Sequence, residues 1–155
     1  MMSNKKICFC SSSGGHFEQL MMRKPLMEKY DSFIITEKIE GSNEDIGVKT
    51  YYLPQINRLE KLFFIKLILV FLKSIYIYVL ERPQVTISTG VLATIPFCLL
   101  SKLFGTKIIY IESFAKINTP TKTGNLLYRY ADRFYVQWES MLEIYPNAIY
   151  KGRLY

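Results

Sequence analysis

The chain has 155 residues and a mass of 18.2 kDa, which corresponds to one domain at about 100–200 residues per domain. Hydrophobic residues make up 50% of it and charged residues 21%, so it can form one packed core, and intrinsic disorder is excluded. The length also excludes an enzyme with two complete nucleotide-binding domains, unless a second chain supplies the other half.

The net charge of +7 comes from the later part of the chain. Up to Asn57, seven basic and seven acidic residues cancel, whereas from Arg58 onward thirteen basic residues stand against six acidic ones. The same part holds the most apolar segment and most aromatic residues, a combination typical of contact with an anionic membrane surface. Because the sequence has no basic run, zinc-finger spacing or RNA-binding aromatic signature, no nucleic-acid partner is expected.

The cysteines are expected to be buried free thiols in a reducing cytoplasm. Cys8 and Cys10 share one face of a predicted strand, too close along it to pair easily, and Cys98 lies far away in sequence. With a single histidine, no metal site is expected. The first apolar run is too short for a signal peptide, so the chain is expected on the cytoplasmic side.

Hydrophobic periodicity and turn residues predict alternating strands and helices. Strands are expected at residues 7–10, 33–36, 48–53, 85–88, 107–111 and 134–136. Helices are expected at residues 16–30, 58–81, 91–104 and 124–131, with a helical turn at 139–144. Pro25 should kink or shorten the first helix, Asn57 and Glu60 should form a capping box before the second, and Arg82-Pro83 should end it. This alternation predicts one α/β domain over residues 1–155, a Rossmann-like parallel sheet with helices on both faces.

The loop Ser-Ser-Ser-Gly-Gly-His at residues 11–16 lies where the first strand passes into a helix. Open α/β sheets bind anions at such turns, because backbone N–H groups and the helix dipole point toward the ligand. His16, the only histidine, is placed to donate a hydrogen bond to a diphosphate or to transfer a proton. The loop matches neither the dinucleotide fingerprint nor the phosphate loop, so NAD and ATP are poorly supported. A tight turn whose glycines serve only packing is the alternative.

Ser88-Thr89-Gly90 forms a second turn of this kind, and Glu112-Ser113 ends a strand at the same edge of the sheet. Glu112 is therefore placed either to hydrogen-bond the hydroxyls of a ligand or to orient a neighbouring loop. The polar stretch 113–124 is suited to holding a sugar diphosphate, or else is a solvated connection.

The segment 62–80 is apolar and nominally long enough to cross a bilayer. Two lysines within it argue against crossing, since each costs about 2.5–3.5 kcal/mol at the centre of an inserted helix. A crossing would also separate strands of one sheet. The segment carries more apolar surface than one sheet face can cover, so an interfacial helix is favoured over a purely core helix. The expected membrane-contact residues are Arg58, Lys61, Phe63, Phe64, Lys66, Leu67, Val70, Phe71 and Lys73.

The two glycine turns, the Tyr-Ile-Glu-Ser strand end and the block Tyr-Arg-Tyr-Ala-Asp-Arg-Phe-Tyr-Val-Gln-Trp at 128–138 occur in one characteristic order. In that order they resemble bacterial capsule and exopolysaccharide proteins of the PssD/CpsF type. These proteins are similar to the membrane-anchoring subunit of the eukaryotic two-component N-acetylglucosaminyltransferase of the dolichol pathway. More distantly, the chain is similar to the N-terminal half of the glycosyltransferase MurG.

The resemblance implies the N-terminal, acceptor-binding half of a GT-B glycosyltransferase. A separate small protein would supply the C-terminal half that binds the UDP-sugar donor, and this chain alone would bind no cofactor and show little or no transferase activity. The acceptor would be a sugar on undecaprenyl diphosphate, in capsule or exopolysaccharide synthesis. The chain would lie peripherally on the cytoplasmic face of the membrane. The eukaryotic relatives carry an N-terminal membrane span that is not expected here, so attachment would fall to 62–80 and the basic residues around it.

Carried over by position, the resemblance implies an acceptor-diphosphate site, with His16 as a tentative general base. The implied binding residues are Ser12, Ser13, Gly14, Gly15, His16, Thr89, Gly90, Glu112 and Ser113. Two alternatives stay open: a self-sufficient small nucleotide-binding enzyme, and a non-catalytic scaffold that recruits a glycosyltransferase to the membrane.

Overall fold

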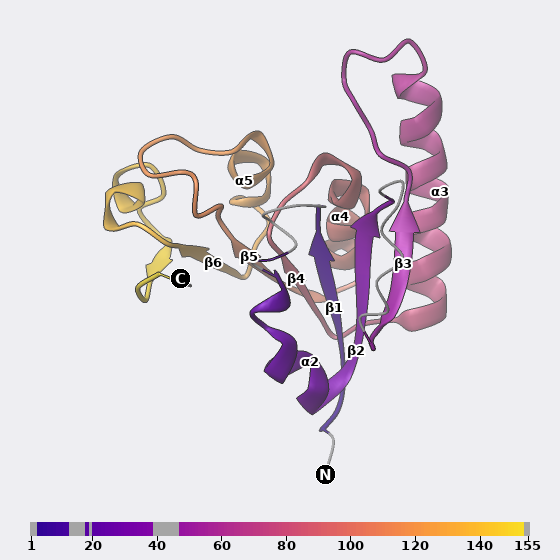
Figure 1. Cartoon of the computed structure of the whole chain (residues 1–155), viewed down its shortest axis with the longest axis horizontal. Helices are drawn as coiled ribbons and strands as arrows, with labels where there is room; N and C mark the ends of the chain where they lie inside the picture. Colours follow the sequence, from indigo (N-terminus) through magenta and orange to yellow (C-terminus); the bar gives the residue numbers. More distant parts are fainter. Residues whose placement is uncertain (1–2, 13–17, 19, 39–46, 154–155) are drawn as a thin grey trace.

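The computed structural model describes residues 3–12, 18, 20–38 and 47–153 (Figure 1). Its strands are β1 (Ser3–Ser11), β2 (Tyr30–Glu37), β3 (Lys49–Leu53), β4 (Val85–Ser88), β5 (Lys107–Ile111), β6 (Arg133–Val136) and β7 (Ile149–Tyr150). Its α-helices are α2 (Lys24–Lys29), α3 (Phe63–Glu81), α4 (Ile95–Leu103) and α5 (Lys122–Leu127). Two short 3-10 helices, η1 (Leu92–Thr94) and η2 (Glu139–Glu143), complete the described elements.

The strands form one parallel sheet in the order β3-β2-β1-β4-β5-β6-β7. From β1 the chain proceeds outward through β2 to β3, and from β4 it proceeds outward in the opposite direction. The connections therefore reverse direction between β1 and β4, and such a switch point opens a crevice at the carboxyl edge of the sheet. The Rossmann-like fold predicted from the sequence is confirmed.

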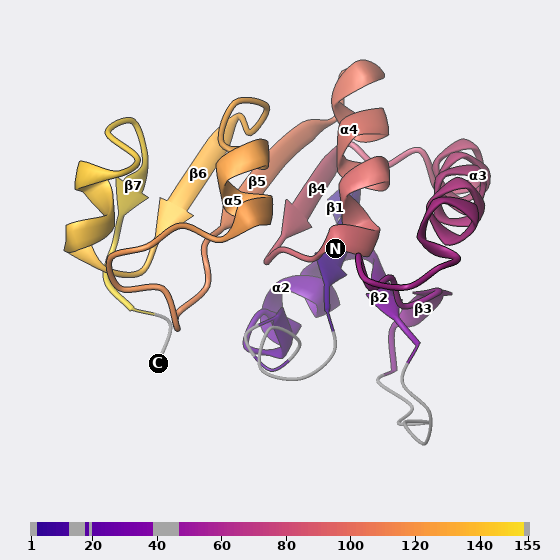
Figure 2. The ribbon, with the colours of Figure 1, turned by 90° about the horizontal axis from the view of Figure 1, so that it is seen from above.

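Helices cover both faces of the sheet, with α3, α4 and α5 on one side and α2 on the other (Figure 2). The side chains of β1 alternate accordingly, because successive residues of a strand point to opposite faces. Phe9 packs with Met27 on the α2 side, whereas Cys8 and Cys10 pack toward α3 and α4. As predicted, the cysteines are free and buried; the Sγ atoms of Cys8 and Cys10 lie 3.6 Å apart.

The long helix begins later than the sequence predicted, at Phe63. Asn57 Oδ1 accepts a hydrogen bond from the amide of Leu59 at 3.0 Å, and the Asn57 carbonyl accepts one from the amide of Glu60. The Glu60 carboxylate pairs with Lys66. The predicted capping residues thus stabilise a separate turn before the helix. The predicted end at Glu81 is correct, because Arg82 turns into the left-handed region, with a φ of 45°, before Pro83.

The helix predicted at 16–30 is interrupted near Pro25, as expected. Met22 and Arg23 form a turn, and α2 begins after it with Pro25 in its first turn, where the missing N–H of proline has no cost. α2 ends at Lys29, one residue before the predicted end, because Tyr30 already belongs to β2; the beginning of the predicted helix falls outside the described residues. β7 was missed because two paired residues leave no periodic signal.

The carboxylate of Glu81 fastens the end of α3 to the sheet. It accepts hydrogen bonds from Lys6 Nζ at 2.9 Å, Lys49 Nζ at 2.5 Å and Tyr51 Oη at 2.5 Å, and its side chain is buried. Burial by itself would raise the pKa of Glu81, but the hydrogen bonds from Lys49, Tyr51 and Lys6 outweigh it and lower the pKa to about 2. A buried charge with these partners joins α3, β1 and β3 at the amino edge of the sheet.

We expect Glu81→Gln to destabilise the fold by about 1–3 kcal/mol at pH 7, because it removes the charge but leaves its cationic partners in place. A carboxylate with a lowered pKa contributes stability above its unfolded pKa, and this contribution is lost as the pH falls. The wild-type advantage should therefore disappear between about pH 4.5 and pH 2. Urea unfolding of both chains at pH 7 and pH 3 measures this.

The matched control is Glu60→Gln, which removes a half-exposed ion pair with Lys66 and should change stability by less than about 0.5 kcal/mol. Equal urea midpoints for wild type and Glu81→Gln at pH 7 would contradict the anchoring role.

Candidate functional site

The carboxyl ends of β1 and β4 lie side by side at the switch point of the sheet (Figure 1). The amide of Thr89 donates to the carbonyl of Cys10 at 3.0 Å, and the amide of Gly90 donates to Ser88 Oγ at 3.2 Å. Ser12 and Thr89 are both buried. Polar residues at neighbouring carboxyl ends form the kind of edge that binds anionic groups in open α/β sheets.

The structure brings together only part of the predicted diphosphate site. Ser12, Thr89 and Gly90 share the switch point, whereas Glu112 lies at the end of β5, the strand next to β4. The predicted residues Ser13, Gly14, Gly15 and His16 lie outside the described residues.

Gly90 occupies a position that only glycine fits. Its φ is +96°, and a Cβ atom built there would lie 2.6 Å from the hydroxyl oxygen of Tyr110. The second turn therefore packs directly on a side chain of β5.

The carboxylate of Glu112 is fully buried and is surrounded by donors from its own chain. Oε1 accepts from the amide of Ser113 at 2.8 Å and from Thr121 Oγ1 at 2.9 Å. Oε2 accepts from the amide of Thr121 at 3.3 Å and from Tyr145 Oη at 3.1 Å. The Glu112 carbonyl in turn accepts from Gln137 Nε2 at 2.9 Å. Of the two roles that the sequence left open for Glu112, this geometry favours orienting the neighbouring loop.

Thr121 connects this carboxylate to the second glycine turn. Its hydroxyl donates to Glu112 and accepts from the amide of Gly124 at 2.8 Å, which caps α5. A hydroxyl has one proton, so Tyr110 Oη, 3.2 Å away, is the donor in its bond to Thr121. Tyr110 is the residue on which Gly90 packs, and the network therefore runs from β5 to the switch point.

Two tyrosines share this environment. Burial, and then the charge of Glu112, raise the pKa of both Tyr110 and Tyr145 above the usual range. Both phenols therefore keep their protons, and can donate hydrogen bonds, to a higher pH than an exposed tyrosine. Tyr110, Tyr145 and Gln137 were not predicted from the sequence as members of this network. The sequence does contain a signal for Thr121, which stands three residues before Gly124, an N-cap spacing.

Helix α3 is attached to the sheet along a narrow stripe. Its buried residues recur at helical spacing and are Val70, Ser74, Ile77, Tyr78 and Glu81. Much of its remaining surface is apolar and exposed, and in its most apolar stretch of 18 residues only 22% is buried. By length and composition it is the one helix, within the described part of the chain, that could cross a membrane. Because β3 and β4, on either side of it, belong to one parallel sheet, α3 must return alongside that sheet.

The membrane-contact residues predicted from the sequence do not all lie on this exposed surface. Val70 is fully buried in the core, so the prediction for it was wrong. Phe63 and Leu67 are partly buried against the same core, whereas Phe64 and Phe71 are exposed.

The two lysines of α3 bind their own chain. Lys66 pairs with Glu60, and Lys73 Nζ donates to the carbonyl of Tyr52 at 2.6 Å. Both lysines therefore lie on the side of the helix that meets β3 and the segment after it. Arg58 and Lys61 are exposed.

A basic cavity of about 300 Å³ lies on the face of the sheet opposite α3. Arg23, Lys151 and Arg153 line it together with apolar residues of β4, β5 and β6. Burial lowers the pKa of Arg23, and the guanidinium of Arg153 lies 3.9 Å from the ring centre of Trp138. The sequence analysis did not bring these cations together, because 128 residues separate Arg23 from Lys151.

Solved structures share this fold at low sequence identity. MurG of Acinetobacter baumannii superposes with a TM-score of 0.72 at 14% identity, over 88% of this chain and 42% of that one. UDP-GlcNAc 2-epimerase from Neisseria meningitidis gives 0.66 at 11% identity, over 96% of this chain and 47% of that one. The chain thus spans less than half the length of these structures. Its fold is that of a Rossmann-like domain of a GT-B glycosyltransferase, as the sequence predicted.

Residues 36–154 match the family model described as oligosaccharide biosynthesis protein Alg14 like, and the chain belongs to this family. It is 29% identical to a UDP-N-acetylglucosamine transferase subunit ALG14 of Yarrowia lipolytica, over 98% of this chain and 82% of that protein. The human protein of the same name is 33% identical over 79 residues, 47% of this chain and 37% of its own length. The predicted resemblance to the eukaryotic subunit is confirmed.

We expect Glu112→Gln to destabilise the fold by about 2–4 kcal/mol. The amide NH₂ of glutamine cannot accept the hydrogen bonds that a carboxylate oxygen accepts here, so their donors would lose their acceptor. Tyr145→Phe removes a single hydrogen-bond donor and should destabilise the fold less, by about 1 kcal/mol. Thermal and urea unfolding of the isolated chain measure both. If Glu112 served only to bind a ligand, Glu112→Gln would unfold at the wild-type midpoint.

Proposed function

We propose that this chain is the acceptor-binding, membrane-docking subunit of a two-component glycosyltransferase. A separate protein with a second Rossmann-like domain holds a UDP-sugar. The two chains together transfer a hexose to a sugar linked to undecaprenyl diphosphate, in capsule or exopolysaccharide synthesis. The relatives named as UDP-N-acetylglucosamine transferase subunits make that nucleotide sugar the first donor to test.

The observation that carries the proposal is the exposed apolar surface of α3. Phe64, Leu72 and Val79 are each more than half exposed, although the helix belongs to a domain with a complete core. An apolar helix face this long is expected to be covered by a membrane or a partner. With the exposed cations Arg58 and Lys61 at its beginning, a bilayer surface with anionic headgroups fits best. The chain would lie peripherally on the cytoplasmic face.

The polar edge at the switch point supports the proposal that the chain binds the acceptor. Ser12 directly precedes in sequence the residues that lead to His16, and Thr89 and Gly90 follow the neighbouring strand; all four residues are proposed to bind the diphosphate of the acceptor. Glu112 and Ser113, predicted as direct ligands, are proposed to act through the loop that they orient.

The transfer itself is a direct displacement. The acceptor hydroxyl oxygen attacks the anomeric carbon of the donor, the bond from that carbon to the diphosphate oxygen breaks, and UDP leaves with the electron pair. The hydroxyl proton passes to a base, for which His16 is the proposed group. Since the donor is proposed to lie on the partner, this chain alone has no reaction to perform.

We expect transfer to require both chains. Membranes from cells that express this chain together with a neighbouring small Rossmann-like protein should transfer N-acetylglucosamine from its UDP derivative to a lipid-linked acceptor. Membranes with either chain alone should show little or none. His16→Ala should lower the rate of the pair about a hundredfold or more if His16 is the base.

Full activity of the partner alone would reduce this chain to a scaffold. Activity of this chain alone would make it a self-sufficient enzyme. An unchanged rate for His16→Ala, with both chains required, would remove the proposed base but keep the two-chain assignment.

Binding to vesicles containing phosphatidylglycerol should depend on the outer surface of α3. Phe64→Glu and Leu72→Glu should each weaken binding about tenfold or more, because burying one large apolar side chain contributes about 1.5–3 kcal/mol. Met22→Glu is the matched control, an exposed apolar residue next to α2 on the opposite face. Flotation through a sucrose gradient measures the bound fraction. Equal losses in all three variants would contradict docking through α3.

A further inference from the structure

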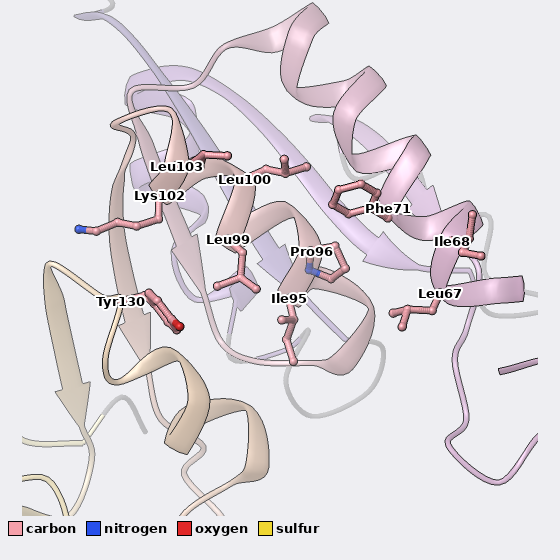
Figure 3. A pocket seen from close by; sticks show the side chains of 10 residues that line it. All are labelled: Leu67, Ile68, Phe71, Ile95, Pro96, Leu99, Leu100, Lys102, Leu103 and Tyr130. Atoms are coloured by element: carbon pink, nitrogen blue, oxygen red, sulfur yellow. The ribbon is translucent and has the colours of Figure 1, made fainter. Parts of the chain in front are cut away.

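A wide apolar groove of about 760 Å³ lies between α3 and the segment around Tyr130, with α4 as its floor (Figure 3). Phe71 and Ile68 form its wall on α3, and Leu99 extends from α4 into its middle. Tyr130 and Lys102 stand on the opposite side. The volume is within the range of sites that enclose small ligands.

We propose that this groove holds the hydrocarbon chain of the lipid-diphosphate acceptor, an inference that rests on the proposed function and assigns a site to the acceptor's lipid. The acceptor would lie with its diphosphate at the switch point and its isoprenoid chain across α4. The rest of α3 would contact the bilayer.

The chemistry of the lining favours a hydrocarbon over a protein segment. Apart from Lys102 and Tyr130, the lining residues are apolar. The Lys102 ammonium is already paired with Asp132 Oδ1 at 2.8 Å. A protein partner normally brings about one hydrogen bond per 100–200 Å² of interface and a polar rim, whereas an isoprenoid chain needs neither.

The position of the groove favours the chain of the acceptor over the acyl chains of bulk lipid. Ile95 and Pro96, at one end of the groove, follow Gly90 by five and six residues, through η1. One amphiphile can therefore reach from the carboxyl edge, where an anionic headgroup is proposed to bind, into the groove. An acyl chain of bulk lipid would have its headgroup at the bilayer surface instead.

The groove is also continuous with the exposed surface of α3. Ile68 and Phe71 line the groove and are themselves exposed, as is Leu103 at its other end. An isoprenoid chain leaving the bilayer along α3 can enter the groove without crossing water, which removes the main barrier to its extraction.

Photolabelling of the full chain on vesicles containing phosphatidylglycerol tests this. One probe is farnesyl diphosphate with a diazirine on its chain, and the other is phosphatidylcholine with a diazirine on its acyl chain. We expect the farnesyl probe to label Ile95, Leu99 and Leu100, and excess unlabelled farnesyl diphosphate to suppress that labelling. The phosphatidylcholine probe should label Leu72 and Val79 instead.

Leu99→Trp fills the groove without adding charge and should lower labelling by the farnesyl probe about tenfold, which corresponds to about 1.4 kcal/mol. Met22→Trp is the matched control, with added bulk at an exposed apolar position on the opposite face of the sheet, and should leave that labelling unchanged. Leu103→Trp, at an exposed position of the groove, repeats the test with no demand on the core. Circular dichroism checks the fold of each variant.

The proposal is overturned if the farnesyl probe does not label the groove, if the phosphatidylcholine probe labels it equally well, or if Met22→Trp reduces labelling as much as Leu99→Trp. None of these results depends on a donor-binding partner or on sugar transfer. A failed transfer assay with groove labelling intact would therefore count against the proposed function alone.

Discussion

The carboxyl edge of this domain is organised around one buried negative charge. Burying an ionised carboxylate without hydrogen-bond donors around it costs the fold several kcal/mol of stability. Glu112 meets this requirement with donors from the loop after β5, the beginning of α5 and the segment after η2. These segments have little regular structure to hold them in place. The need to satisfy Glu112 gives them one arrangement, and through Thr121 and Tyr110 it also supports the turn at Gly90.

The opposite edge of the sheet also contains a buried glutamate, which there attaches a helix rather than a set of loops. Glu81, with its lysine and tyrosine partners, holds the end of α3, and a stripe of small and apolar residues holds its middle. Because these contacts already attach α3 to the sheet, the rest of its apolar surface is not required to stabilise the domain. That surface is available for contacts outside the domain. The same domain thus carries a polar carboxyl edge and an exposed apolar helix face.

Much of this arrangement was predictable from the sequence. β4 and β5 match their predicted bounds exactly, because short runs of β-branched residues between turn signals leave little ambiguity. The beginning of α3 was not predictable, since Asn57 and Glu60 have the spacing of a capping box yet form a separate turn. The turn at Gly90 and Glu112 were placed at one edge correctly, because parallel strands bring their carboxyl ends together. What Glu112 binds was not predictable, because Tyr145 lies 33 residues away in the chain.

The buried thiols have a practical consequence. Burial raises the pKa of both Cys8 and Cys10, so in the folded chain neither is ionised at neutral pH nor reached by solvent. An alkylating reagent can consume them only when the sheet opens between β1 and its covering helices. The rate at which these thiols are alkylated therefore reports how often the domain opens. It also means that a cysteine introduced on the surface of α3 can carry a spectroscopic label while the natural ones stay in place.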